Sequence, residues 1–261
     1  VAVLANCAPV LLACSIAGAL PAGPWTAYGA LAAGVALTVG ALSSLVLPGR
    51  LRASGLTPAI IGVSLGLFGL LSGTLGIQPE RISALLAALL LLACLSIPWL
   101  AMASTPVRVT GPSAAAQIDP RQIDKSVSMG VSMSVSIRLG TCLALVILTP
   151  ILCSTSQGIA LSALIGAALM LSTRSIRSRV EVLIGVLSGM AVLAWAAYAA
   201  ALQSASSLLL VLVTSLTGSL LVLATNVVTP KTRPWLSRTA DTISTLVIIA
   251  VPPFALYMWG M

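Results

Sequence analysis

The residues that could do chemistry in this chain are few and widely spread. None of the 261 residues is a histidine, so the usual general base and the usual zinc ligand are both missing. The five carboxylates lie near predicted loops and form no pair inside an apolar segment. The five cysteines lie within or at the ends of apolar stretches, where we expect small buried side chains rather than disulfides or metal ligands; they are Cys7, Cys14, Cys94, Cys142 and Cys153. The sequence therefore predicts no enzyme, no cofactor and no metal.

The positions of the thirteen basic residues indicate a membrane topology. A net charge of +8 could indicate a nucleic-acid ligand, but the basic residues fall in short clusters between apolar segments instead of on one face. Lysine and arginine in short loops mark the cytoplasmic side of a membrane. Twelve of them occupy one alternating set of loops, namely Arg50, Arg52, Arg108, Arg121, Lys125, Arg138, Arg174, Arg177, Arg179, Lys231, Arg233 and Arg238. The opposite loops hold only Arg81, beside Glu80. We therefore predict residue 1 on the cytoplasmic side, an extracytoplasmic C-terminus and no nucleic-acid partner.

The composition fits lipid as the surrounding solvent. Hydrophobic residues make up 59% of the chain and charged residues 7%, whereas a soluble domain has about 25% charged residues. Long apolar runs in lipid must satisfy their own backbone hydrogen bonds, and about 20 residues cross a bilayer. We predict an all-α polytopic bundle with nine spans at residues 1–20, 25–47, 58–77, 82–103, 139–153, 158–171, 180–202, 206–228 and 239–261. The spans 139–153 and 158–171 are short, so a re-entrant hairpin is the alternative there.

One long connection divides the predicted spans into four and five. The expected parts are a first bundle at 1–103, a cytosolic linker at 104–138 and a second bundle at 139–261. Within the linker, residues 125–138 read KSVSMGVSMSVSIR, a near-repeat of four residues in which serine alternates with apolar residues. The alternation alone would allow a strand. An isolated strand at a membrane surface leaves backbone groups unpaired, so we predict an interfacial helix that runs directly into the span 139–153.

A stripe of glycines marks the third predicted span. Gly62, Gly66, Gly69, Gly73 and Gly76 lie on one face of a helix and contain two GxxxG units. Missing side chains allow another backbone or a lipid tail to approach closely, which gains dispersion contacts where no hydrophobic force acts between helices. Helix packing within the chain is the simpler interpretation, and a subunit or lipid interface is the alternative.

Two charged clusters flank the later spans on the predicted cytoplasmic side. The first contains Arg174, Arg177 and Arg179, and the second contains Arg233, Arg238 and Asp241. Contact with lipid headgroups is the simpler role for both clusters, and docking of a cytosolic partner is the alternative.

Two stretches resemble a known family. The arginine turn LMLSTRSIRSRVEVLIGVLSG and the terminal LSRTADTISTLVIIAVPPFALYMWGM are similar to those of EccD, the polytopic membrane component of type VII (ESX) secretion systems. The residues that carry the resemblance are Arg174, Arg177 and Arg179, then Arg238, Asp241, Pro252 and Tyr257. The resemblance implies eleven spans behind a cytosolic ubiquitin-like domain, so nine predicted spans fit if two are missing. It also implies a second EccD copy, the EccC ATPase, EccB, EccE and membrane lipids as partners.

Together these features predict a noncatalytic inner (cytoplasmic) membrane subunit. The resemblance implies that two copies form a scaffold around a vestibule for protein export, which the partner ATPase drives. A small-solute secondary transporter is the alternative, because several spans are interrupted by proline. A transport site would normally include an ionisable group near the middle of a span, and here every charge is expected at a span end. A membrane transferase using Asp119 and Asp124 is a third, weaker possibility.

Overall fold

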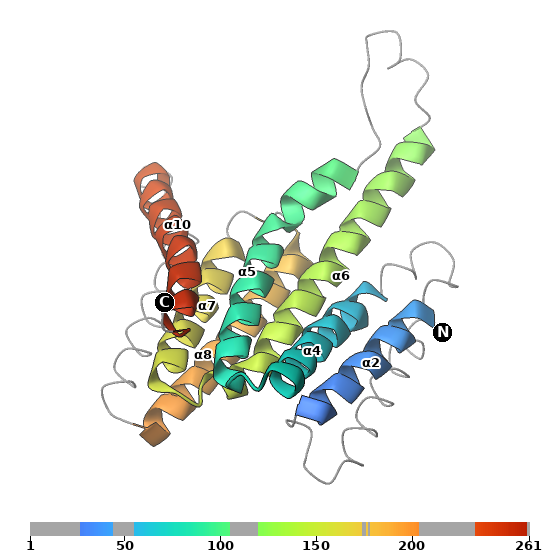
Figure 1. Ribbon diagram of the computed structural model, residues 1–261. Coiled ribbons are helices and arrows are strands. Elements are labelled where there is room, and N and C mark those ends of the chain that lie inside the picture. Colours follow the sequence, from blue (N-terminus) through green and yellow to red (C-terminus); the bar gives the residue numbers. More distant parts are fainter. Residues whose placement is uncertain are drawn as a thin grey trace.

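The computed structural model describes residues 27–43, 55–104, 120–173, 176, 178–203 and 233–259. Every regular element in these ranges is a helix, which confirms the all-α fold class (Figure 1). The helices are α2 (Ala27–Ser43), α4 (Leu56–Leu75), α5 (Pro79–Ser104), α6 (Pro120–Leu152), α7 (Ser156–Ser172), α8 (Arg179–Gln203) and α10 (Arg233–Tyr257).

Four of these helices are long and apolar enough to cross a membrane by length and composition. The qualifying segments are all of α4, Pro79–Ser96 of α5, Gly130–Leu152 of α6 and all of α8. Shorter apolar segments, Ala30–Val39, Ser156–Ser172 and Thr242–Tyr257, belong to α2, α7 and α10. The protein is thus multi-pass, but nine spans are not shown. The predicted spans 1–20 and 206–228 lie outside the described residues.

The central helix of the described bundle is α6. It packs against α4 and α5 and also contacts α7 and α8, while α2 packs against α4 and α10 packs against α7 and α5. Figure 1 shows α2 and α10 on opposite sides of this arrangement. Large buried side chains from four helices fill the main core, among them Phe68, Ile82, Leu91, Leu145, Leu148 and Leu161. A second core between α7 and α8 contains Ile159, Met170 and Leu193.

Helix α7 is short because other helices surround it. It has 17 residues, of which 13 are buried, and an apolar helix of that kind belongs inside a bundle. Its start is fixed locally by Thr155, whose extended backbone (φ −115°, ψ 153°) lets its side-chain oxygen accept a hydrogen bond from the Gly158 amide at 3.1 Å. The length of α7, about 26 Å, therefore does not need to match the bilayer by itself.

Helix α6 joins the helix expected at 125–138 to the span expected at 139–153. It is one continuous helix of 33 residues, and its membrane-compatible segment begins at Gly130. The expected helix at 125–138, running directly into the span 139–153, is therefore confirmed as a helix. The Arg138 side chain within it is buried inside the bundle. In Figure 1 the first turns of α6 project beyond the other helices beside the end of α5. The division of the chain into two bundles and a linker stays a prediction.

We expect the Thr155→Ala variant to destabilise the α7 start. Loss of an N-cap side chain costs about 1 kcal/mol, so the midpoint of thermal unfolding of the detergent-solubilised protein should fall by a few degrees. The Thr155→Ser variant keeps the accepting oxygen and should unfold at the parent temperature. Equal unfolding of the Ala and Ser variants would contradict the capping role.

Candidate functional site

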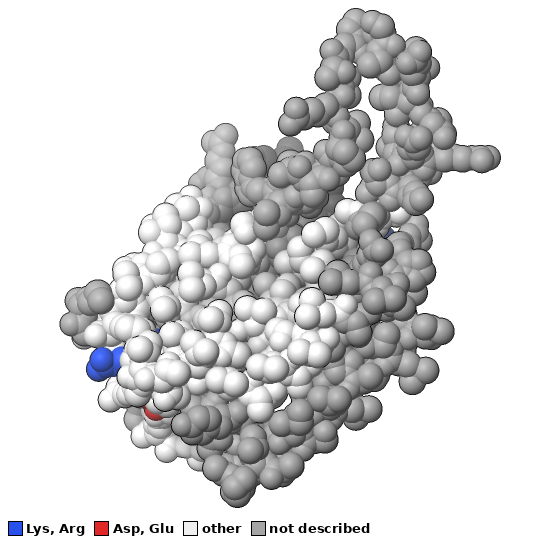
Figure 2. Space-filling model, turned by 45° about the vertical axis from the view of Figure 1, so that its right-hand side comes forward, with Lys and Arg blue, Asp and Glu red and all other residues white. Residues whose placement is uncertain are grey.

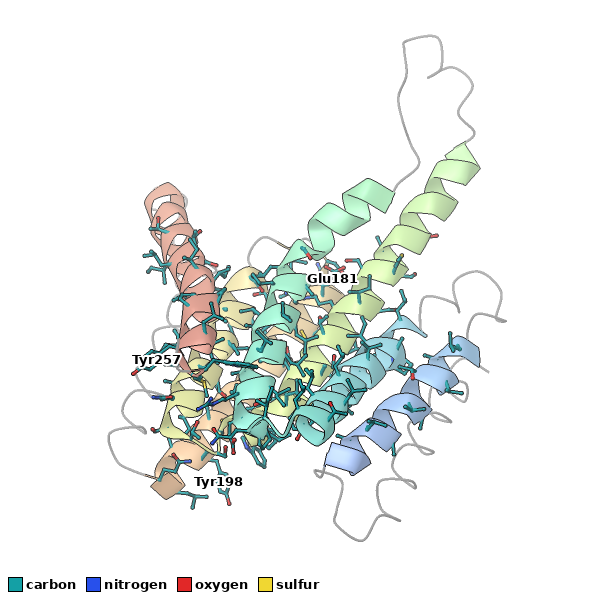
Figure 3. The ribbon with its side chains drawn as sticks, viewed as in Figure 1. Glu181, Tyr198 and Tyr257 are labelled. Carbon is teal, nitrogen blue, oxygen red and sulfur yellow. The ribbon has the colours of Figure 1, made fainter. Side chains whose placement is uncertain are left out.

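A buried polar cluster joins α6, α7 and α8 at one end of the bundle. Arg138 of α6 donates a hydrogen bond from Nη2 to Ser172 Oγ at the end of α7, at 3.2 Å. Ser134, one turn earlier in α6, donates from Oγ to Glu181 Oε1 in the first turn of α8, at 2.8 Å. Figure 3 shows Glu181 at this end of α8 and Tyr198 near the other end. These bonds fix the positions of three helices relative to one another.

The Arg138 side chain is only 3% exposed. Its guanidinium lies against Gly185 of α8, where an added Cβ would come within 3.0 Å of Nη2 and 2.6 Å of Thr173 Cγ2. Gly185 therefore provides the space that the guanidinium occupies. The Nε atom is buried and has no hydrogen-bond partner among the described residues. A buried charged group with an unused donor is uncommon and calls for an explanation.

The expectation that every charge lies at a span end was wrong for Arg138. This residue is eight positions inside the membrane-compatible segment of α6, and Glu181 beside it is only 9% exposed. Average hydropathy over a short stretch of sequence places an arginine at a solvated position. It takes no account of Ser172 and Gly185, which are distant from Arg138 in the sequence. The sequence feature that indicates this contact is the spacing of Glu181 and Gly185, which lie one turn apart on the same face of α8. The cluster lies at the end of α7 and the start of α8, whereas its α6 members Ser134 and Arg138 lie in the middle of that long helix.

The opposite end of the bundle is joined by a second set of hydrogen bonds. Gln203 donates from Nε2 to the carbonyl oxygens of Cys153 and Ser154, at 3.0 and 3.2 Å. Ser154 donates from Oγ to Glu80 Oε1 at 3.3 Å. Trp259 donates from Nε1 to the carbonyl oxygen of Arg81, at 3.0 Å. Segments from four helices are therefore linked here, and they belong to the loops and C-terminal end predicted to be extracytoplasmic.

Part of the glycine stripe lies in the contact between α2 and α4. A Cβ on Gly34 of α2 would come within 2.5 Å of Gly66 Cα and 2.7 Å of the Gly62 carbonyl oxygen. Gly62 is enclosed in turn, since a Cβ there would lie 2.9 Å from the Gly34 carbonyl oxygen. Gly69 is buried, whereas Gly73 is exposed. The two helix backbones are therefore in direct contact along the first half of the stripe.

Gly76 has a different position from the rest of the stripe. It has φ +60° and ends α4 in the left-handed conformation that favours glycine at a helix C-terminus. An added Cβ at this position would meet no atom within 4 Å. Whether any stripe glycine contacts another subunit or lipid stays a prediction.

The structure describes little of the two predicted charged clusters. Arg174 and Arg177 lie outside the described residues. Arg179 is exposed at the start of α8. Arg233, Arg238 and Asp241 lie on the backbone of α10, and their side chains are outside the described set. Their contacts with headgroups or a partner stay a prediction.

Apart from the hydrogen bonds around Ser154, the described surface is largely apolar. The described part of the face in Figure 2 is almost entirely uncharged, apart from small blue and red areas near its lower left edge. A groove of about 340 Å³ lies between α4 and α5. Its walls are apolar apart from Ser64, and its lining residues are Ala59, Ile60, Val63, Ser64, Leu67, Leu86, Leu89, Leu90 and Ala93. Within the ranges that the structure describes, no group of three histidine, cysteine, aspartate or glutamate side chains could hold a metal.

These features define a multi-pass α-helical membrane protein whose helices are fixed by glycine contacts and a few polar bonds. The family model for the EccD-like transmembrane domain matches residues 1–261, so the chain belongs to the EccD family. The fold resembles the structure of protomer 1 of the ESX-3 core complex, with a TM-score of 0.70 and 15% sequence identity. That match covers 97% of this chain and 61% of the other chain. No curated protein matches.

We expect the Gly34→Ala variant to force α2 away from α4. Its methyl group would meet the Gly66 backbone, which cannot rotate aside as a flexible side chain can, and overpacking costs about 1–3 kcal/mol. The thermal unfolding midpoint in detergent should fall. The Gly66→Ala variant is the matched control, because its Cβ would lie 3.9 Å from Gly34 Cα in ordinary contact. Equal effects of the two substitutions would contradict this contact geometry.

Proposed function

We propose that this chain is a noncatalytic integral membrane subunit of a type VII secretion system. Two copies pair to form a membrane scaffold around a vestibule, and a partner ATPase drives the export of protein through it. The observation that carries the proposal is the match of the EccD-like transmembrane domain over residues 1–261. The likeness in fold to a protomer of the ESX-3 core complex supports it. The match covers 61% of the chain in that structure, so the assembly of this chain is part of the proposal.

The chemistry of the chain supports a structural role. It contains no histidine and only five carboxylates. Arg138 and Glu181, the buried charged side chains among the described residues, bond to serines of neighbouring helices. The proposed family role places the source of energy for export in another subunit. The partners that we propose are a second EccD copy, EccB, the EccC ATPase, EccE and membrane lipids.

We further propose nine spans with residue 1 on the cytoplasmic side and the C-terminus outside. The charge rule supports this orientation, because twelve of thirteen basic residues lie in one set of loops. Aromatic pairs support the positions of the membrane surfaces, since Trp195 lies 5.8 Å from Tyr198 and Phe254 lies 6.3 Å from Tyr257 between ring centres. Figure 3 places both tyrosines toward the end away from Glu181. Aromatic side chains with a polar tip favour the membrane–water interface.

The orientation can be tested by labelling with a membrane-impermeant thiol reagent. Ser154→Cys lies on the exposed turn between α6 and α7, and Arg179→Cys lies at the exposed start of α8. We expect Ser154→Cys to react in right-side-out vesicles and Arg179→Cys to react in inverted vesicles. The parent chain, labelled in parallel, corrects for its native cysteines. The reverse pattern would contradict the proposed orientation.

Co-purification tests the proposed assembly directly. We expect gentle detergent extraction of the tagged native protein to give a particle in the megadalton range. Mass spectrometry of that particle should identify a second copy of this chain and an FtsK-like ATPase. A lone monomer or a small homodimer would contradict the secretion function and would favour a small-solute transporter.

A further inference from the structure

The contact between α6 and α8 contains two buried opposite charges that do not form an ion pair. Arg138 bonds to Ser172, and Glu181 accepts its bond from Ser134. The Arg138 Nε has no partner among the described residues. Burying such charges is a poor way to gain stability, because apolar side chains of similar size often stabilise a protein equally or more. The pair therefore needs an explanation other than stability.

The part of α6 before Arg138 cannot fix its own position along α8. Residues 127–133 read VSMGVSM and residues 131–137 read VSMSVSI, so five of seven positions are identical at a spacing of four. Because four residues are close to one helical turn, a slide of α6 by about 6 Å would place nearly identical side chains on the same neighbours. No hydrophobic force between helices in lipid selects one of these positions.

Arg138 interrupts the repeat on the side of α6 that faces α8. Positions 126, 130, 134 and 138 hold Ser, Gly, Ser and Arg. Ser134 bonds to Glu181, and the Arg138 guanidinium lies against Gly185, one turn farther along α8. A slide by one turn would place Gly130 or Arg138 beside Glu181 and would remove the guanidinium from the space above Gly185. Only one register therefore satisfies both contacts.

We propose that Arg138, together with Glu181, is a positioning residue that selects the register of α6 against α8. A single buried polar residue fixes the register of paired helices in the same way at a cost in stability. Since α6 is continuous, its register also sets the position of Pro120, about 27 Å along the helix axis from Arg138. This inference concerns the chain by itself and does not depend on the proposed function.

The register can be measured as a distance between two spin labels. Val131 on α6 and Leu202 on α8 are 49% and 71% exposed, so both positions accept a labelled cysteine. They are separated mainly along the helix axes, so a slide by one turn changes the distance by about 6 Å. The measurement uses the chain in lipid nanodiscs, with Cys7 and Cys14 replaced by serine. The other three cysteines are buried.

We expect the parent chain to show one distance and the Arg138→Met variant to show a second one, offset by up to about 6 Å. The Arg138→Met variant should unfold at or above the parent temperature, whereas a merely structural role would lower this temperature and leave the distance unchanged. Arg138→Lys keeps the positive charge and should restore a single distance. Ser132→Ala is the matched control, because the Ser132 hydroxyl bonds to the Ser128 carbonyl in its own helix.

If the single variant misfolds, the double variant Arg138→Met/Glu181→Leu removes both buried charges. We expect this variant also to show a second distance. A single, unchanged distance in the folded Met variants would overturn the proposal. This result would be independent of the co-purification outcome, because it is obtained on the isolated chain.

Discussion

Lipid supplies no hydrophobic force between apolar helices, and the arrangement of this bundle depends on what replaces that force. Close backbone approach is one replacement, as between Gly34 of α2 and Gly66 of α4. Hydrogen bonds between helices are the second replacement, and they are concentrated at the two ends of the bundle. The middle of the bundle is then filled by large apolar side chains such as Phe68, Leu91 and Leu148. Their packing adds dispersion contacts but does little to select one relative position of the helices.

Most buried hydroxyl groups do not help to select the relative position of the helices. Ser64, Thr149 and Ser188 each donate a hydrogen bond to a carbonyl oxygen three or four residues earlier in their own helix. Such bonds satisfy the hydroxyl without contacting a neighbouring helix. Thr57 differs, because it donates from α4 to the Ser136 carbonyl oxygen of α6 at 2.9 Å. The relative position of the helices therefore depends on a small number of side chains.

The sequence predicted helix positions well where apolar length alone decides them. The expected spans 58–77, 82–103 and 180–202 correspond to α4, α5 and α8, because a backbone in lipid must satisfy its own hydrogen bonds. It failed at Arg138, where burial depends on Ser172 and Gly185 rather than on local hydropathy. The glycine stripe was visible in the sequence, but its neighbour Gly34 was not, since pairing between distant segments leaves no periodic signal. Contacts between helices were thus the part that sequence patterns could not supply.

The distribution of polar groups in the described helices also supports the proposed scaffold over a solute transporter. A transporter needs polar or ionisable groups at mid-span where the solute binds. Here the cluster around Arg138 lies near one end of the bundle, and the groove between α4 and α5 has almost entirely apolar walls. The bonds at the opposite end link Glu80, Ser154 and Gln203, and these groups hold loops together rather than line a path. Within the described helices the polar groups therefore connect elements of the protein to one another, which is what a subunit that shapes a larger assembly requires.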